Sequence, residues 1–144
     1  MTATSRYTGK NLHVVFRTSA GVEYTLHGDQ TRLEVTEEVQ SADMTAGSDT
    51  GVYEKPTLQV MGATLTVKHT GASGTAVWVG VDIGDEGTLI YGPAGTAAGA
   101  PKGGFPCYVR SRSLDVPYNE AVVRTATFGP QGARLYDVET DVWP

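Results

Sequence analysis

The sequence predicts an all-β protein, a sandwich or barrel of about seven or eight antiparallel strands. Along most of the chain, apolar and polar side chains alternate, which is the period of a strand with one buried face. Short segments rich in Gly, Pro, Asn and Asp, the residues of turns, separate these alternating runs. The chain has 144 residues and is 40% hydrophobic, which suits one domain spanning residues 1–144.

The first two alternating runs predict a β-hairpin. Residues 11–18 and residues 22–27 each alternate, and the segment 19–21 between them contains a glycine. Two such runs around a short glycine-containing turn are typical of a hairpin. A third strand is predicted at residues 32–36.

Residues 39–56 carry no hydrophobic period and are mostly small and polar, so they predict a long loop. Loops of that length inside a compact domain are uncommon and usually functional or mobile. We expect this loop to be mobile in a free subunit and ordered by neighbours in an assembly, because its composition buries little apolar area. Tyr53 is better placed there for an interface than for a core, so Tyr53→Ala should weaken assembly more than folding.

The next strand carries apolar positions that change parity between Val60 and Ala63. We predict a β-bulge at Met61 and Gly62, because one extra residue would return both sets of side chains to one face. Residues 75–82 then fit either a buried strand, which their valine content favours, or a short helix.

The second half of the chain predicts four more strands. A short strand at residues 88–91 precedes a glycine-rich loop at 92–104. The longest strand candidate, residues 105–116, should pair with residues 121–128 across the turn between them. A last strand at residues 135–143 closes the chain.

Composition excludes several classes of function. The net charge of −5 argues against a generic nucleic-acid-binding surface, which needs clustered Lys and Arg. No apolar run approaches the roughly 20 residues of a membrane span, so we expect no membrane insertion. The N-terminus lacks the apolar core of a secretory signal, and Cys107 has no second cysteine to pair with. We expect a cytoplasmic protein unless it leaves the cell inside a larger particle.

Candidate catalytic motifs are weak. Asp49-Thr50-Gly51 matches the tripeptide of aspartic proteases, but those enzymes place it after an apolar strand, whereas small polar residues precede it here. The three histidines lie far apart in sequence and lack the spacing of metal ligands. We therefore predict no enzymatic activity, no cofactor and no metal site.

Two groups of charges share predicted strand faces, because side chains two residues apart on a strand point the same way. One group is basic and lies on residues 105–116, and the other is acidic and lies on residues 135–143. Such stripes face either solvent, or other subunits or a channel. The candidate lumen or interface charges are Glu23, Glu34, Arg110, Arg112, Asp137, Glu139 and Asp141. We expect the two arginines to pair with carboxylates of a neighbouring strand or subunit.

Three segments of the sequence resemble the tail tube proteins of long-tailed bacteriophages. The first is the loop 43–49 followed by Tyr53, and the second is residues 87–102. The third is the strand pair 109–126, whose turn runs Leu-Asp-Val-Pro-Tyr-Asn-Glu-Ala-Val-Val from residue 114.

This resemblance implies a β-sandwich with one short helix, which would fall at residues 75–82. It also implies homohexameric rings that stack into a hollow tube, with a lumen of strands from all six subunits. DNA would pass through without specific binding, and the other partners would be tape measure and terminator proteins. The protein would reside in the virion tail, and in the host cytoplasm during assembly. The implied subunit-contact residues are Asp43, Met44, Thr45, Asp49 and Tyr53.

Three other functions stay open at this point. Capsid-decorating and head–tail completion proteins share small β folds and lack catalytic motifs. A ligand-binding barrel of lipocalin type would need a closed apolar cavity and a monomer. A hydrolase using Asp49 would also differ from a tube protein in its mass in solution.

Overall fold

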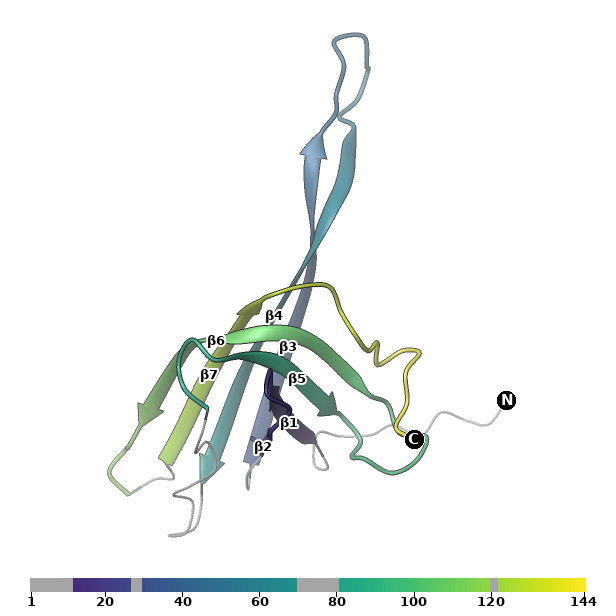
Figure 1. Cartoon of the computed structure of the whole chain (residues 1–144). Coiled ribbons are helices and arrows are strands. Elements are labelled where there is room, and N and C mark those ends of the chain that lie inside the picture. Colours follow the sequence, from purple (N-terminus) through teal and green to yellow (C-terminus); the bar gives the residue numbers. More distant parts are fainter. Residues whose placement is uncertain (1–11, 27–29, 70–80, 120–121) are drawn as a thin grey trace.

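The computed structural model describes residues 12–26, 30–69, 81–119 and 122–144, and these residues form one antiparallel sheet (Figure 1). The all-β prediction is confirmed, and none of the described residues is helical. The helix-or-strand alternative at 75–82 falls mostly on residues outside the described ones. The strand order is β2-β1-β5-β6-β7-β4-β3. The strands are β1 (His13–Thr18), β2 (Glu23–Thr25), β3 (Gln30–Asp43), β4 (Glu54–His69), β5 (Glu86–Gly92), β6 (Gly103–Asp115) and β7 (Val122–Pro130).

The predicted hairpins form as expected. β1 and β2 pair antiparallel, and the turn between them closes with a 2.8 Å hydrogen bond from the Thr18 N–H to the Val22 carbonyl. Gly21 has φ +86° in this turn, a conformation that glycine adopts without steric cost. β6 and β7 also pair antiparallel across the predicted turn.

The predicted loop at 39–56 is wrong in its bounds, because most of it is strand. β3 continues to Asp43 and β4 begins at Glu54, so only residues 44–53 form a loop. β4, with 16 residues, also replaces β6 as the longest strand. Residues 39–58 project from the body as a two-stranded ribbon, which we call the arm (Figure 1). Both faces of this ribbon are exposed, so its strands need no apolar period.

The bulge predicted at Met61 and Gly62 is also wrong. Both residues pair in unbroken register with β3, and the register shifts instead between Val39 and Ser41. Val60 pairs with Glu38 on the face opposite the core. The parity change therefore marks apolar residues on two different faces of one regular strand.

A second bulge lies in β6, where the register against β7 shifts between Val109 and Ser111. Arg110 is the extra residue. Directly opposed residues in an antiparallel pair share a face, and Arg112 pairs with the buried Ala126. Arg112 therefore points to the core side, while Ser111 points to the opposite side.

The last predicted strand, at 135–143, is absent. This segment makes only isolated bridges, Gly104 with Tyr136 and Pro101 with Val142. It is fastened to the loop before β6 by backbone hydrogen bonds, among them a 2.9 Å bond from the Trp143 N–H to the Ala100 carbonyl.

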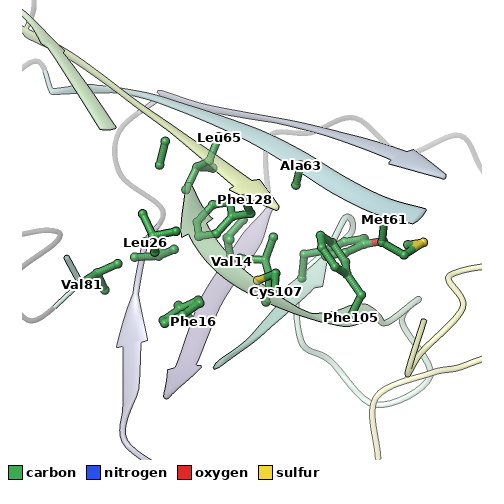
Figure 2. Close-up of a cluster of buried hydrophobic side chains, with 14 of the residues drawn as sticks. Val14, Phe16, Leu26, Met61, Ala63, Leu65, Val81, Phe105, Cys107 and Phe128 are labelled. Atoms are coloured by element: carbon green, nitrogen blue, oxygen red, sulfur yellow. The ribbon is translucent and has the colours of Figure 1, made fainter. Parts of the chain in front are cut away.

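The sheet curves so that its concave face encloses the core (Figure 2). Phe16 on β1 and Phe128 on β7 stack with ring centroids 5.9 Å apart, although two strands separate β1 from β7. Chain connectivity also brings the two sheet edges together, because the three residues between Leu26 and Gln30 span at most about 14 Å. Among the described residues, the other fully buried large side chains are Phe105, Leu26, Met61, Leu65, Leu89, Val14, Val67, Val109 and Cys107.

Gly87→Ala should destabilise the fold by about 1–3 kcal/mol, the usual effect of overpacking. A Cβ at Gly87 would lie 2.2 Å from the Arg17 carbonyl oxygen on the paired strand, and backbone cannot move aside cheaply. Gly51→Ala is the matched control, because its Cβ would meet nothing within 4 Å. Urea unfolding of both variants checks the prediction, and equal midpoints for the two would contradict it.

Candidate functional site

The face of β3, β4, β6 and β7 opposite the core carries rows of hydroxyl groups. In one row Ser111 pairs with Thr127, which pairs with Thr64. The next row is Ser113, Thr125 and Thr66 in the same relation. These side chains alternate along each strand with buried residues such as Phe128 and Leu65, so they all project away from the core. We call this surface the hydroxyl face.

Charges on the hydroxyl face balance. Within the body of the sheet, outside the arm, it carries three basic side chains and three acidic ones among the described residues, placed there by strand register and, for Arg110, by its contact with Tyr108. They are Arg32, Lys68, Arg110, Glu34, Glu38 and Asp115. A strand surface with uncharged hydroxyls and no net charge has little electrostatic attraction for a polyanion.

The two predicted interface arginines do not share a face, because the β6 bulge separates them. Arg110 lies over the Tyr108 ring, and its Nε donates a 3.2 Å hydrogen bond to the Tyr108 hydroxyl. Arg112 donates a 2.6 Å hydrogen bond to the Val81 carbonyl and pairs with Asp82 at 3.1 Å. Arg112 thus has a carboxylate partner, but this partner lies in the turn before β5 and not on a neighbouring strand or subunit as expected. The described residues provide no carboxylate for Arg110.

The predicted acidic stripe at the C-terminus does not form either, since this segment is a turn. The Asp137 N–H donates a 2.7 Å hydrogen bond to the Asp141 carboxylate, and the Glu139 N–H donates a 3.0 Å bond to Asp137. Arg134 pairs with Asp137 at 3.5 Å. Of the remaining candidates, Glu23 forms an ion pair with Arg17 in the first hairpin. Among the five acidic candidates, only Glu34 lies on the hydroxyl face.

The five predicted contact residues gather at the end of the arm, where polar groups shape the loop. The Asp43 carboxylate accepts a 2.9 Å hydrogen bond from the Thr45 N–H, and Asp49 accepts a 2.7 Å bond from the Ala46 N–H. Hydrogen bonds from Thr45 hold the pKa of the Asp43 carboxyl below its usual value. By accepting the hydrogen bond from Ala46, the Asp49 carboxylate caps the turn at the end of the arm. The Thr45 hydroxyl also accepts a 2.9 Å bond from the Tyr53 N–H.

Apolar side chains on the arm are left open to solvent. Val52 is 80% exposed and Leu58 is 67% exposed. Tyr53, Met44 and Val39 are each more than half exposed. Such side chains lose water contact only against a partner, so the arm is a candidate interaction element. The predictions that the arm is mobile when free, and that Tyr53→Ala weakens assembly, remain predictions.

The buried ionisable groups are poorly suited to chemistry near neutral pH. Burial raises the pKa of the Cys107 thiol to about 12, so the thiolate is scarce. Burial, and next the Glu37 carboxylate, raise the pKa of the Tyr91 hydroxyl to about 12. Among the described residues, no three His, Cys, Asp or Glu side chains gather as a metal site would need. No helix within the described residues is long and apolar enough to cross a membrane.

Sequence reasoning missed the hydroxyl face. In the sequence, this face corresponds to pairs of hydroxyl residues that stand two apart, at 64 and 66, at 111 and 113, and at 125 and 127. Only the pairing of β6 with β7 and of β7 with β4 turns these separate pairs into continuous rows.

Chains from several solved structures share this fold. No family model matches the sequence, and no curated protein does. A chain from the tail of an empty gene transfer agent (GTA) particle, computed with helical refinement and C6 symmetry, has a TM-score of 0.62 at 11% identity, covering 92% of this chain and 99% of that chain. A chain from the virion of a native GTA particle has a TM-score of 0.60 at 13% identity, with the same coverage. A chain from the 6-fold symmetrised baseplate of the anti-feeding prophage has a TM-score of 0.57 at 10% identity, covering 93% and 98%. These likenesses show a shared fold.

Proposed function

We propose that this chain is the tube subunit of a phage-like tail, forming homohexameric rings that stack into a hollow tube through which DNA passes. The observation that carries the proposal is the hydroxyl face, together with a fold also seen in a tail refined with C6 symmetry. Its further partners would be the tape measure and terminator proteins. Its place would be the virion tail, after assembly in the host cytoplasm. A structural role of this kind requires no enzymatic activity.

The sheet edges support ring formation. β2 and β3 end the strand order, so each has only one strand neighbour within the described sheet. An exposed edge with unpaired backbone groups favours association with another chain, and closing a ring of sheets removes such edges. The long edge of β3, at 14 residues, is the stronger candidate for this contact.

The hydroxyl face is the surface we assign to the lumen. DNA must slide through a tube without being held, and each lysine or arginine that neutralises a phosphate adds affinity through counterion release. The balanced charges and hydroxyl rows of this face avoid that affinity. We therefore expect an inner surface that is net neutral or negative.

Native mass spectrometry and negative-stain electron microscopy of the purified protein test the assembly. Hexamers at low concentration and stacked rings at high concentration are the expected results. A strict monomer at every concentration and salt condition would overturn the proposal.

A second candidate is a tail component that forms one ring and does not polymerise, such as a head–tail completion protein. A chain from a baseplate shares this fold at a TM-score of 0.57, so the fold also occurs in a part of a particle other than the tail tube. This observation supports the second candidate. Micrographs separate the two functions, since only a tube subunit forms particles of increasing length.

Placing lysines on the hydroxyl face should make the assembled tube bind DNA. In Thr64→Lys/Thr127→Lys, two paired positions become cationic in each subunit. We expect DNA affinity to rise by at least about tenfold at low salt and to fall again as salt increases. The measurement is binding of a short labelled DNA to assembled protein. Thr96→Lys/Thr140→Lys, at exposed positions off the sheet, is the control. An equal gain in both variants would argue against a lumen on this face.

A further inference from the structure

The arm leaves the sheet where β4 loses one of its two neighbouring strands. β4 pairs with β7 only from Ala63 onward, so before Ala63 it pairs with β3 alone within the described sheet. We call the paired residues 37–39 and 59–61 the root of the arm. The register shift between Val39 and Ser41 adjoins this root, and such bulges bend a strand. The root is thus the place where the ribbon can most readily change its angle to the body.

Apolar burial ends within the root. Met61 is buried in the core, whereas Gln59, two residues nearer the tip, is exposed. An apolar groove of about 460 Å³ lies beside the root, between β3, β5 and the C-terminal segment. Its lining includes Glu37 of the root, and also Tyr91 and Val138. The core side of β3 is therefore incompletely covered next to the arm.

Arg134 contacts the root from the C-terminal segment. Its Nη1 donates a 2.8 Å hydrogen bond to the Glu37 carboxylate on β3. Its backbone N–H lies 3.4 Å from the side-chain oxygen of Gln59 on β4. Its Nη2 lies 3.5 Å from the Asp137 carboxylate. One guanidinium thus bridges a carboxylate of the arm root and a carboxylate of the body.

The segment that carries Arg134 is itself fastened to the sheet. The next residue, Leu135, donates a 2.9 Å backbone hydrogen bond to the carbonyl of Gly104 on β6. The Asp137 carboxylate accepts a 3.0 Å hydrogen bond from the Glu139 N–H, which holds it in the C-terminal turn. Arg134 therefore belongs to the body, and the arm root is held against it.

We infer that Arg134 is a positioning residue that fixes the direction of the arm relative to the sheet. The ten residues 39–48 reach at most about 33 Å, at about 3.3 Å per strand residue. A rotation of about 10° at the root would therefore move the tip by up to about 6 Å. An arm held at one angle presents its exposed apolar side chains already oriented, which lowers the ordering cost of binding a partner. This role belongs to the single chain and does not depend on the formation of a tube.

Distances between two spin labels on the free subunit test this role. One label is attached at Val52→Cys on the arm, and the other at Ser113→Cys, an exposed position of β6 that is paired with β7. The native Cys107 is fully buried, so it should not be labelled. Double electron–electron resonance then gives the distribution of distances between arm and body. We expect this distribution to become at least about twofold broader after Arg134→Ala.

Three further variants define the contact. Arg17→Ala is the matched control, because it removes an arginine that is ion-paired with Glu23 in the first hairpin, and it should leave the width unchanged. Glu37→Gln removes the charge on the root side and should broaden the distribution as Arg134→Ala does. Arg134→Lys should give an intermediate width, because one ammonium lacks the planar fork that reaches both carboxylates.

The melting temperature separates positioning from a general structural role. Partly exposed ion pairs contribute little to global stability, so Arg134→Ala and Glu37→Gln should melt close to the parent protein. Unchanged widths in both variants would overturn the positioning role, as would equal broadening by Arg17→Ala. Broadening that comes only with a large fall in melting temperature, in both variants, would also overturn it, because the arm would then move through loss of the fold.

Discussion

Replacing residues 44–53 with an Asn-Gly turn should abolish assembly and leave the sheet folded. Asp43 and Glu54 are directly paired, so a two-residue turn can connect them without changing the register. The tip bonds mainly within itself, so its removal takes little from the body of the sheet. A loop of two residues in place of ten lowers the entropic cost of loop closure by about 1.4 kcal/mol. The free subunit should therefore become slightly more stable.

Thermal unfolding and negative-stain microscopy of the same preparation check this prediction. The expected pair of results is an unchanged or higher melting temperature and a complete loss of tubes. Full-length Gly51→Ala is the control, since it keeps the tip and adds a methyl group in open space. Tubes of normal length from the shortened arm would show that the tip has no part in assembly.

Phe128→Ala should cost about 3–5 kcal/mol of unfolding free energy, the range for large-to-small changes in a core. Phe128 is 1% exposed and stacks on Phe16 across the concave face of the sheet (Figure 2). Its loss leaves a cavity at the point where distant strands meet. Domains of this size have a total stability of about 5–15 kcal/mol, so the variant should be marginally folded and should not assemble.

Urea denaturation measures the effect of Phe128→Ala. Leu58→Ala is the control, because Leu58 is 67% exposed on the arm, and surface changes usually stay within about 0.5 kcal/mol. A loss below about 1 kcal/mol for Phe128→Ala would mean that the sheet does not depend on this contact.

The alternating segments of the body could be predicted from sequence because their pattern records burial on one side. Phe16 on β1 and Leu89 on β5 lie on such runs, and the strands form where predicted. The turn at 19–21 and the pairing of β6 with β7 were also predictable, since hairpins depend on neighbours in the chain. The arm was not, because both faces of its strands meet solvent and only cross-strand hydrogen bonds define it.

For the candidate site, the sequence determined which residues gather at the arm tip, since the tip is a single continuous segment from Met44 to Tyr53. Tertiary structure alone decided the two other surfaces. The bulge at Arg110 reverses which side chains of β6 face the core, and a one-residue change of register moves every following side chain to the other face. Hydroxyl residues from β4, β6 and β7 become rows, and β3 meets β5 at a groove, only through pairing and curvature between segments far apart in the chain. Alternation within one strand shows that it has two faces, but the strands beside it decide what each face joins.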